Sequence, residues 1–207
     1  MSQFFQIHVE NPQPRLIAQA AAIIRSGGVI IYPTDSCYAL GCHLGDKTAI
    51  DRIRRIKKVE PSHDFTLVCR DLSEVSVYAV VDNPGYRLLK GLTPGPYTFI
   101  LKATHEVPRR LLNPKRKTIG LRVPGNAIVM KLLEALGEPI MSTTVMLPEQ
   151  QIPLTDPYEM NTLLGKGVDL IIDGGDCGIE PTSVVDLMGE VPKVLRQGKG
   201  DTQSLTY

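Results

Sequence analysis

Helical and strand patterns alternate along most of this chain, and this alternation limits the folds open to it more than any other feature. Residues 15–26 carry apolar side chains at helical spacing up to a Gly-Gly pair, and the apolar run at 29–32 is typical of a buried strand. The same spacing rules predict further helices at 48–57, 85–90, 127–136 and 158–164, and further strands at 66–69, 98–102, 118–123, 140–143, 169–172, 183–187 and 193–195. Strands joined by helices favour parallel pairing, whereas the last strands are too close in sequence for a helical crossover and require antiparallel pairs. We therefore expect an α/β fold with a twisted, mixed parallel and antiparallel sheet and flanking helices.

The chain shows no internal repeat and no low-complexity tract that would divide it. We expect a single domain over residues 14–200, with an N-terminal tail at 1–13 and a C-terminal tail at 201–207. The 207 residues are 43% hydrophobic and 22% charged, and no apolar run approaches the length of a membrane span, which excludes the disordered and transmembrane classes. The N-terminus lacks a basic segment followed by a long apolar one, so we expect a cytoplasmic protein without a membrane partner.

Four cysteines and four histidines are scattered through the sequence. Cys37, Cys42, Cys69 and Cys177 match neither a paired zinc-ribbon spacing nor a dense disulfide framework, and the chain has no His-x-x-x-His pair. We expect reduced structural thiols and no metal site.

The segment at residues 32–42, which follows the first apolar run, carries hydroxyl groups and glycine where α/β sheets commonly hold ligands. The hydroxyls of Thr34, Ser36 and Tyr38 could hydrogen-bond a small polar ligand. Alternatively, Thr34 and Asp35 only complete a turn through side-chain hydrogen bonds to the backbone. Both interpretations stay open at this point.

Arg122 stands in an otherwise apolar strand end, between Leu121 and Val123. A buried guanidinium needs an anionic partner, which could be a ligand phosphate or carboxylate, or a structural Asp or Glu. The sequence contains no Walker A motif, no Gly-x-Gly-x-x-Gly after a first strand and no Gly-x-Ser-x-Gly elbow. Any nucleotide must therefore be held in another way.

Basic residues gather in two short windows, 52–58 and 109–117. On the predicted helix 48–57 the isoleucines take one side and the basic residues the other, so these charges could be only a solvated face. Together with the second window they could instead form a track for the phosphate backbone of RNA. No aromatic residues are interleaved to stack on bases, so structured or double-stranded RNA is the better fit. The side chains that we assign to this track are Arg52, Arg55, Arg109, Arg110, Lys115, Arg116 and Lys117.

Several ordered motifs resemble those of one protein family. They are Tyr32-Pro33-Thr34-Asp35-Ser36-x-Tyr38-x-Leu40-Gly41-Cys42, Pro94-Gly95-Pro96-x-Thr98-x-Ile100-Leu101, Gly120-x-Arg122-x-Pro124, Asp173-Gly174-Gly175, Ser183-Val184-Val185-Asp186 and Leu195-Arg196-x-Gly198. Across residues 14–200 the chain resembles the YrdC-like proteins, whose characterised members are threonylcarbamoyl-AMP synthases, and its details are most similar to the YciO branch. The resemblance implies a twisted α/β sheet with a concave, basic face that binds nucleotide and RNA.

The synthases of this family join L-threonine, bicarbonate and ATP into threonylcarbamoyl-AMP and release pyrophosphate, and the product is used to make N6-threonylcarbamoyladenosine in tRNA. The resemblance implies ATP or AMP as ligand, with Mg²⁺ on the nucleotide phosphates, and L-threonine and structured RNA or tRNA as partners. It leaves protein partners and catalytic residues unassigned. Carried over residue by residue, Thr34, Ser36 and Tyr38 line the threonine and carbamate end. The positions that face phosphate or nucleotide are Lys58, Arg122, Thr144, Ser183 and Arg196.

Two positions depart from the family pattern. The Lys-x-Arg that precedes a proline in the family reads Lys58-Val59-Glu60 here, and the Ser-x-Asn of a later loop reads Thr144-Val145-Met146. The first change puts an anion where a triphosphate needs a cation, and the second removes an amide that could donate and accept hydrogen bonds. We therefore expect an RNA- and nucleotide-binding protein with weak or retargeted synthase chemistry. The alternatives are a fully active synthase, which is a nucleotidyltransferase serving tRNA modification, and a double-stranded RNA-binding module without catalysis.

Overall fold

The computed structural model describes residues 2–60, 63–113, 115–148 and 150–205. Its helices are α1 (Pro14–Arg25), α2 (Lys47–Lys57), α3 (Leu72–Tyr78), α4 (Asn83–Leu92), α5 (Ala127–Leu136) and α6 (Pro157–Leu164). Its strands are β1 (Gln3–Gln6), β2 (Ile30–Tyr32), β3 (Ala39–His43), β4 (Thr66–Val68), β5 (Ala79–Val80), β6 (Tyr97–Ala103), β7 (Thr118–Arg122), β8 (Ile140–Thr144), β9 (Leu170–Asp173), β10 (Ser183–Asp186) and β11 (Lys193–Arg196).

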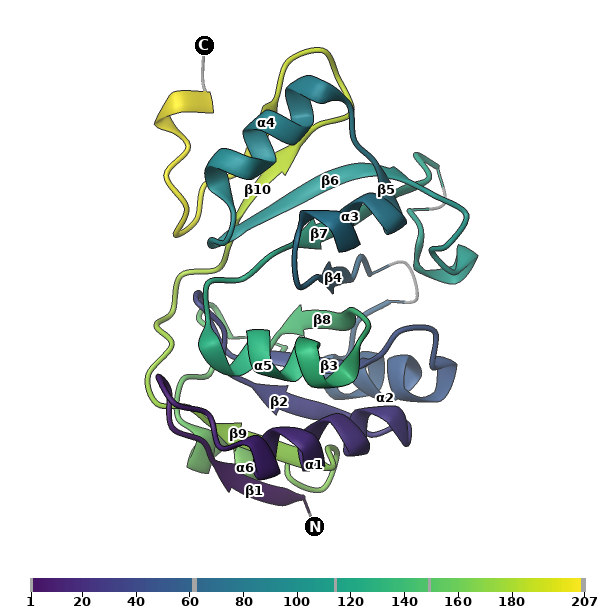
Figure 1. The fold of residues 1–207 in the computed structure, drawn as a ribbon. Helices are drawn as coiled ribbons and strands as arrows, with labels where there is room; N and C mark the ends of the chain where they lie inside the picture. The colour runs from purple at the N-terminus through teal and green to yellow at the C-terminus, as the bar shows by residue number, and fades with distance from the viewer. Residues whose placement is uncertain (1, 61–62, 114, 149, 206–207) are drawn as a thin grey trace.

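The strands form one sheet in the order β1-β9-β2-β3-β8-β4-β7-β6-β10-β11, with β5 paired to β6 outside this path. The pairs β1–β9, β2–β9, β4–β7 and β6–β10 are parallel, and the others are antiparallel. In Figure 1, α1 and α5 pack together over β2, β3 and β8, whereas α3 and α4 lie over β6 and β7. The predicted single-domain α/β fold with a mixed sheet and flanking helices is confirmed.

Local sequence explains where the helix α2 begins and where the helix α5 begins and ends. The Asp46 side chain accepts a hydrogen bond from the backbone N–H of Ala49 and so caps the start of α2. Asn126 caps α5 in the same way, and α5 ends at Gly137, whose φ of +78° a residue without a Cβ adopts easily.

Four elements lie outside the sequence-based predictions. Gln3–Gln6, expected in an N-terminal tail, forms the edge strand β1 beside β9. The strand β3 lies within the segment expected as a loop, and it pairs with both β2 and β8. Its Gly41 and Cys42 are poor indicators of a strand, because strand propensity depends on the sheet that surrounds a residue. The helix α3 and the strand β5 are too short to show a clear period.

The apolar core leaves one part of the sheet free for a site. The strand register places Leu67, Leu121 and Phe99 side by side across β4, β7 and β6, and these side chains share one core cluster with Val75 and Leu89 of α3 and α4. Side chains alternate between the two faces of a strand. The residues next to this apolar row therefore point to the opposite face, where the pocket described below lies.

No helix in the described ranges is both long and apolar enough to cross a membrane.

The segment after β11 packs onto the domain and gives a test of the fold. The Tyr97 hydroxyl donates a hydrogen bond to the Asp201 carbonyl oxygen at 3.0 Å, and Leu205 is buried in the core. A Cβ at Gly200 would lie 2.4 Å from the Tyr97 ring, so Gly200→Ala should lower the free energy of unfolding by about 1–3 kcal/mol. Urea denaturation measures this. Gly91→Ala is the control, since a Cβ at that helical position meets nothing within 4 Å and should stabilise slightly. Equal effects of the two variants would contradict the packing.

Candidate functional site

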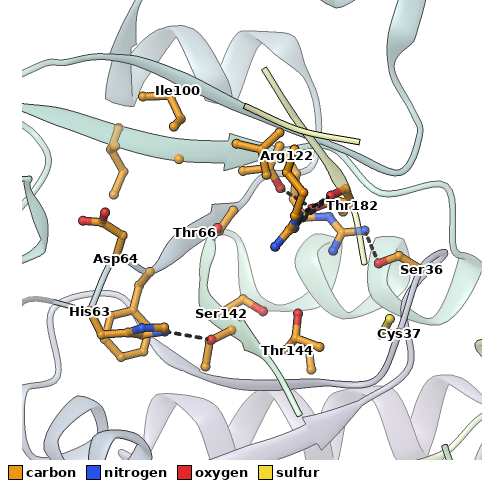
Figure 2. Close-up of a pocket in the computed structure, with 18 of the residues that line it drawn as sticks. Ser36, Cys37, His63, Asp64, Thr66, Ile100, Arg122, Ser142, Thr144 and Thr182 are labelled. Carbon is orange, nitrogen blue, oxygen red and sulfur yellow. Dashed lines mark hydrogen bonds between the residues drawn. The ribbon is translucent and has the colours of Figure 1, made fainter. Parts of the chain in front are cut away.

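A pocket of about 360 Å³ lies over the middle of the sheet, between the loop at residues 33–38 and the segment that follows α2. The strands β4, β6, β7, β8 and β10 contribute side chains to its wall. Figure 2 shows His63 and Asp64 on one side of this pocket, and Arg122 and Ser36 on the other. Its volume falls within the range of small-molecule sites, towards the lower end.

Hydroxyl groups dominate the polar part of the pocket wall. Several of them already have partners: the Oγ1 atoms of Thr98 and Thr182 lie 2.8 Å apart, and Ser142 accepts a hydrogen bond from the Tyr32 hydroxyl at 2.7 Å. Hydroxyls both donate and accept, so such a wall can orient a carboxylate, a sugar or a phosphate. The hydroxyl residues that line the pocket are Ser36, Thr66, Thr98, Thr118, Ser142, Thr143, Thr144 and Thr182.

Arg122 has a structural carboxylate as its partner and also lines the pocket. Its guanidinium contacts the Asp35 carboxylate and donates a hydrogen bond to Ser36 Oγ at 3.3 Å, so a structural anion is present. Its Nε is nevertheless buried and has no hydrogen-bond partner among the described residues. A buried N–H without a partner is costly. Arg122 is only 8% exposed, so its guanidinium is largely desolvated on the pocket wall.

The loop before β3 supports the pocket more than it lines it. Thr34 Oγ1 donates to the Cys37 carbonyl oxygen at 2.6 Å and accepts from the Ser36 backbone N–H at 3.2 Å, which completes a turn. The Tyr38 hydroxyl donates to the Gly175 carbonyl oxygen at 2.7 Å. Of the three hydroxyls assigned to the threonine end, the structure places Ser36 alone on the pocket wall in the described part of the chain.

The lysine on the pocket wall is Lys57 rather than Lys58. Lys58 is exposed at the end of α2, with a φ of +50°, and it does not line the pocket. Lys57 is 7% exposed, and its Nζ donates to Thr143 Oγ1 at 3.0 Å and to the Thr144 carbonyl oxygen at 2.7 Å. Burial lowers the pKa of Lys57 to about 8. The lysine on this pocket wall is therefore one position earlier than the motif suggests.

His63 shares the hydroxyl of Thr143 with Lys57. Its Nε2 lies 3.3 Å from Thr143 Oγ1, and its ring meets the Phe65 ring edge-on, with the centroids 5.4 Å apart. Burial, together with the nearby Lys57 charge, lowers the pKa of His63. We call Lys57, His63 and Asp64 the lysine end of the pocket, and Arg122, Arg196, Ser36 and Thr182 the arginine end.

Arg196 and Ser183, the last two assigned positions, have different places. Arg196 lines the pocket and donates through Nε and Nη2 to the Thr182 carbonyl oxygen at 3.1 and 2.8 Å. Ser183 is fully buried, donates to the Gly200 carbonyl oxygen and accepts from the Gly198 N–H. It therefore fixes the chain after β11. The assigned residues that the structure brings together on the pocket wall are Ser36, Arg122, Thr144 and Arg196.

The two basic windows are partly neutralised within the protein. Arg52 forms an ion pair with Asp169 at 2.8 Å, and Arg116 forms one with Asp186 at 2.7 Å. The side chain of Arg110 lies outside the described part of the structure. The RNA-track residues that are exposed are Arg55, Arg109, Lys115, Arg116 and Lys117. The described residues contain no group of three or more His, Cys, Asp or Glu side chains that could hold a metal ion.

Comparison with known proteins gives a consistent result. The family model Sua5_yciO_yrdC, described as telomere recombination, matches residues 22–198. The chain is similar to an uncharacterized protein YciO of Escherichia coli, with 60% identity over 203 residues and 98% of each chain covered. The crystal structure of E. coli YciO matches with a TM-score of 0.96 and 59% identity over 100% of both chains.

More distant similarity connects the chain to proteins with a named activity. A threonylcarbamoyl-AMP synthase of Pyrococcus abyssi is 30% identical over 182 residues, which are 86% of this chain and 53% of that protein. The crystal structure of P. abyssi Sua5 complexed with L-threonine matches with a TM-score of 0.87 and 26% identity, over 95% of this chain and 58% of that one. The chain therefore spans little more than half the length of that synthase.

Proposed function

Because this chain belongs to the Sua5/YciO/YrdC family, we propose that it is a nucleotide- and RNA-binding protein with weak or retargeted threonylcarbamoyl-AMP synthase chemistry. The observation that carries the proposal is the pocket, whose wall contains the largely buried guanidinium of Arg122 and the largely buried ammonium of Lys57. Groups of this kind are expensive to bury and suit anionic ligands. A threonine carboxylate at the arginine end and a phosphoryl group at the lysine end would use both.

In the proposed reaction the amino group of L-threonine adds to bicarbonate to give a carbamate and water. A carbamate oxygen then attacks the α-phosphorus of ATP, so that the adenylyl group is transferred and pyrophosphate leaves. In this proposal Ser36 and the guanidinium of Arg122 hold the amino acid, and Lys57 offsets charge on the α-phosphoryl group. Any Mg²⁺ would be held by the nucleotide phosphates, which supply the oxygen ligands that this cation prefers. The chain's own contribution is therefore positioning and electrostatics.

Two side chains support weak rather than full activity. Met146 lines the pocket and is 39% exposed, so a thioether faces the ligand where the family pattern has an amide. Glu60 is exposed and lies outside the pocket wall, but its charge opposes that of a polyphosphate. Neither change removes Arg122 or Lys57, which is why we propose retained binding with slow synthesis.

The direct test is pyrophosphate release with ATP, L-threonine, bicarbonate and Mg²⁺. We expect slow turnover compared with a threonylcarbamoyl-AMP synthase assayed in parallel, together with a rise in melting temperature on adding AMP or ATP. Turnover as fast as that synthase would favour the fully active alternative. A melting temperature indifferent to both nucleotides would leave only an RNA-binding module.

The RNA-binding proposal predicts an affinity that depends on salt. Each Lys or Arg that contacts a phosphate contributes about one to the slope of log affinity against log salt. The double variant Arg109→Ala/Lys115→Ala should therefore reduce that slope by about 2, measured by fluorescence anisotropy with a duplex RNA. Lys131→Ala is the control, because Lys131 is exposed on α5, outside both basic windows. Binding that ignores salt and both variants would show that the windows are only a solvated surface.

A further inference from the structure

The Asp-Gly-Gly motif at residues 173–175 forms a turn at the end of β9 and is not part of the pocket wall. The Gly175 backbone N–H donates a hydrogen bond to Asp173 Oδ1 at 3.0 Å. Gly175 has a φ of +77°, which a residue without a Cβ adopts easily. We call these three residues the β9 turn, and its local sequence fixes its shape.

The β9 turn supports both ends of the loop at residues 33–38. Tyr38 is fully buried, and its hydroxyl donates to the Gly175 carbonyl oxygen at 2.7 Å and accepts from the Gly174 N–H at 3.2 Å. At the other end of the loop, Pro33 packs closely on Gly174, since a Cβ on this glycine would lie 2.6 Å from the proline Cγ. A shift of the turn would therefore displace the loop.

The middle of this loop supplies side chains to the pocket. Ser36 and Cys37 line the wall, and Figure 2 shows the hydrogen bond of 3.3 Å from the Arg122 guanidinium to Ser36 Oγ. The Asp35 carboxylate holds the loop from another side, because it contacts Arg122 and accepts from the Gly125 N–H at 2.8 Å. Loss of the Tyr38 contact should therefore shift Ser36 while the loop keeps its fold. A misplacement of about 1 Å is enough to weaken a site strongly.

The lysine end of the pocket is held in a different way. The Lys57 ammonium donates to Thr143 Oγ1 and to the Thr144 carbonyl oxygen, both on β8. The chain after β8 meets Tyr38 through the backbone, where the Val145 N–H donates to the Tyr38 carbonyl oxygen at 2.9 Å. A change confined to the Tyr38 hydroxyl leaves all three hydrogen bonds in place.

We infer that the β9 turn positions the amino-acid half of the site, because it holds the Tyr38 hydroxyl and thereby sets Ser36 against Arg122. The inference rests on the proposed function, which places L-threonine at the arginine end of the pocket. Tyr38 and Gly174 are then positioning residues that do not touch the ligand. A change in either weakens threonine binding and leaves nucleotide binding at the lysine end nearly unaltered.

The test is isothermal titration of the full chain with L-threonine and, separately, with AMP. Tyr38→Phe keeps the ring and removes the hydroxyl, so L-threonine should bind about tenfold more weakly and AMP affinity should change by less than about twofold. In the pyrophosphate assay, the same variant should raise the KM for L-threonine and not that for ATP.

Tyr97→Phe is the matched control. Tyr97 is also buried, and its hydroxyl also donates to a backbone carbonyl oxygen, that of Asp201, but it lies outside the pocket wall. Its loss should lower the melting temperature and leave both affinities unchanged. A purely structural role of Tyr38 would give this same pattern.

Gly174→Ala disturbs the loop from its other end. The added Cβ would push against Pro33 and also against Ile128, which lies 2.6 Å away. This variant should likewise weaken L-threonine binding more than AMP binding. The melting temperature falls for any disturbed packing, so the ratio of the two affinities is the decisive measurement.

The outcomes keep the inference and the proposed function apart. Equal losses of L-threonine and AMP affinity in Tyr38→Phe, or a ratio as unchanged as in Tyr97→Phe, overturn the inference and leave the proposed function standing. An unaltered chain that binds neither L-threonine nor AMP overturns both.

Discussion

Lys57→Met should strongly weaken nucleotide binding and stabilise the ligand-free protein. Burial lowers the pKa of Lys57 from its usual 10.5 to about 8, so the folded state bears a cost of about 3 kcal/mol for the charged form at neutral pH. Methionine removes that charge but leaves the Thr144 carbonyl oxygen without its donor, which returns about 1–2 kcal/mol of the gain. We expect a net gain in unfolding free energy of about 1–2 kcal/mol and a loss of AMP affinity of about a hundredfold.

The dependence on pH identifies the cause of that gain. Below pH 8 the lysine is protonated in both the folded and the unfolded states, so the full cost is present. Between pH 8 and 10.5 the folded protein has released the proton while the unfolded chain still binds it, so the stability of the unaltered protein rises with pH. The advantage of Lys57→Met should therefore shrink over this range, as urea denaturation at several pH values would show.

Lys58→Met is the matched control for this prediction. Lys58 is the next residue, is exposed and does not line the pocket, so its loss should leave both AMP affinity and stability nearly unchanged. If Lys58→Met weakened binding as much as Lys57→Met, the phosphate-facing lysine would be the one that the motif suggests. If Lys57→Met destabilised the protein, its ammonium would be a structural group and not a ligand-binding one.

The periodicity of α2 contained the information needed to choose between these two lysines. Ile50, Ile53 and Lys57 follow helical spacing, and all three are buried. Lys58 falls off this stripe. The motif alignment assigns Lys58 because that residue stands three positions before the proline of the family pattern. Which lysine points towards the pocket instead depends on its position around the helix α2. The fold class was predictable because apolar runs indicate buried strands and helices. An anionic partner for Arg122 was predictable because this residue is the one charge within such a run.

Other parts of the site could not be read from local sequence. His63 and Thr143 meet Lys57 only because a segment after α2 and the strand β8 come together in the folded chain. For Thr34 the sequence left a ligand contact and a turn open, and the structure shows the turn. For Tyr38 nothing in the local sequence indicates that its hydroxyl donates to the distant Gly175 carbonyl oxygen. The strand β3 escaped prediction because Gly41 and Cys42 are poor strand indicators and because one of its two partners, β8, is distant in sequence. Long-range pairing thus decides which hydroxyls are free.

The double variant Glu60→Arg/Met146→Asn should raise synthase activity. Met146 borders the pocket, so an asparagine there gives a ligand an amide partner worth about 1–3 kcal/mol in a desolvated contact, or about tenfold to a hundredfold in rate constant. Glu60 is exposed, so the charge reversal acts through solvent and contributes less. We expect kcat/KM for ATP, followed by pyrophosphate release, to rise about a hundredfold in the double variant.

Measuring kcat/KM at several salt concentrations separates the contribution of Glu60→Arg from that of Met146→Asn. Charges that face solvent are screened within about 8 Å at physiological ionic strength, so the part due to Glu60→Arg should fade as salt is added. The part due to Met146→Asn should persist, because a short hydrogen bond inside the pocket is little affected by screening. Glu60→Gln removes the anion without adding a cation and should give a smaller, equally salt-sensitive gain. A double variant no faster than the unaltered chain would show that residues other than these two limit synthesis, since the scaffold would then hold both family side chains and still fail to use ATP.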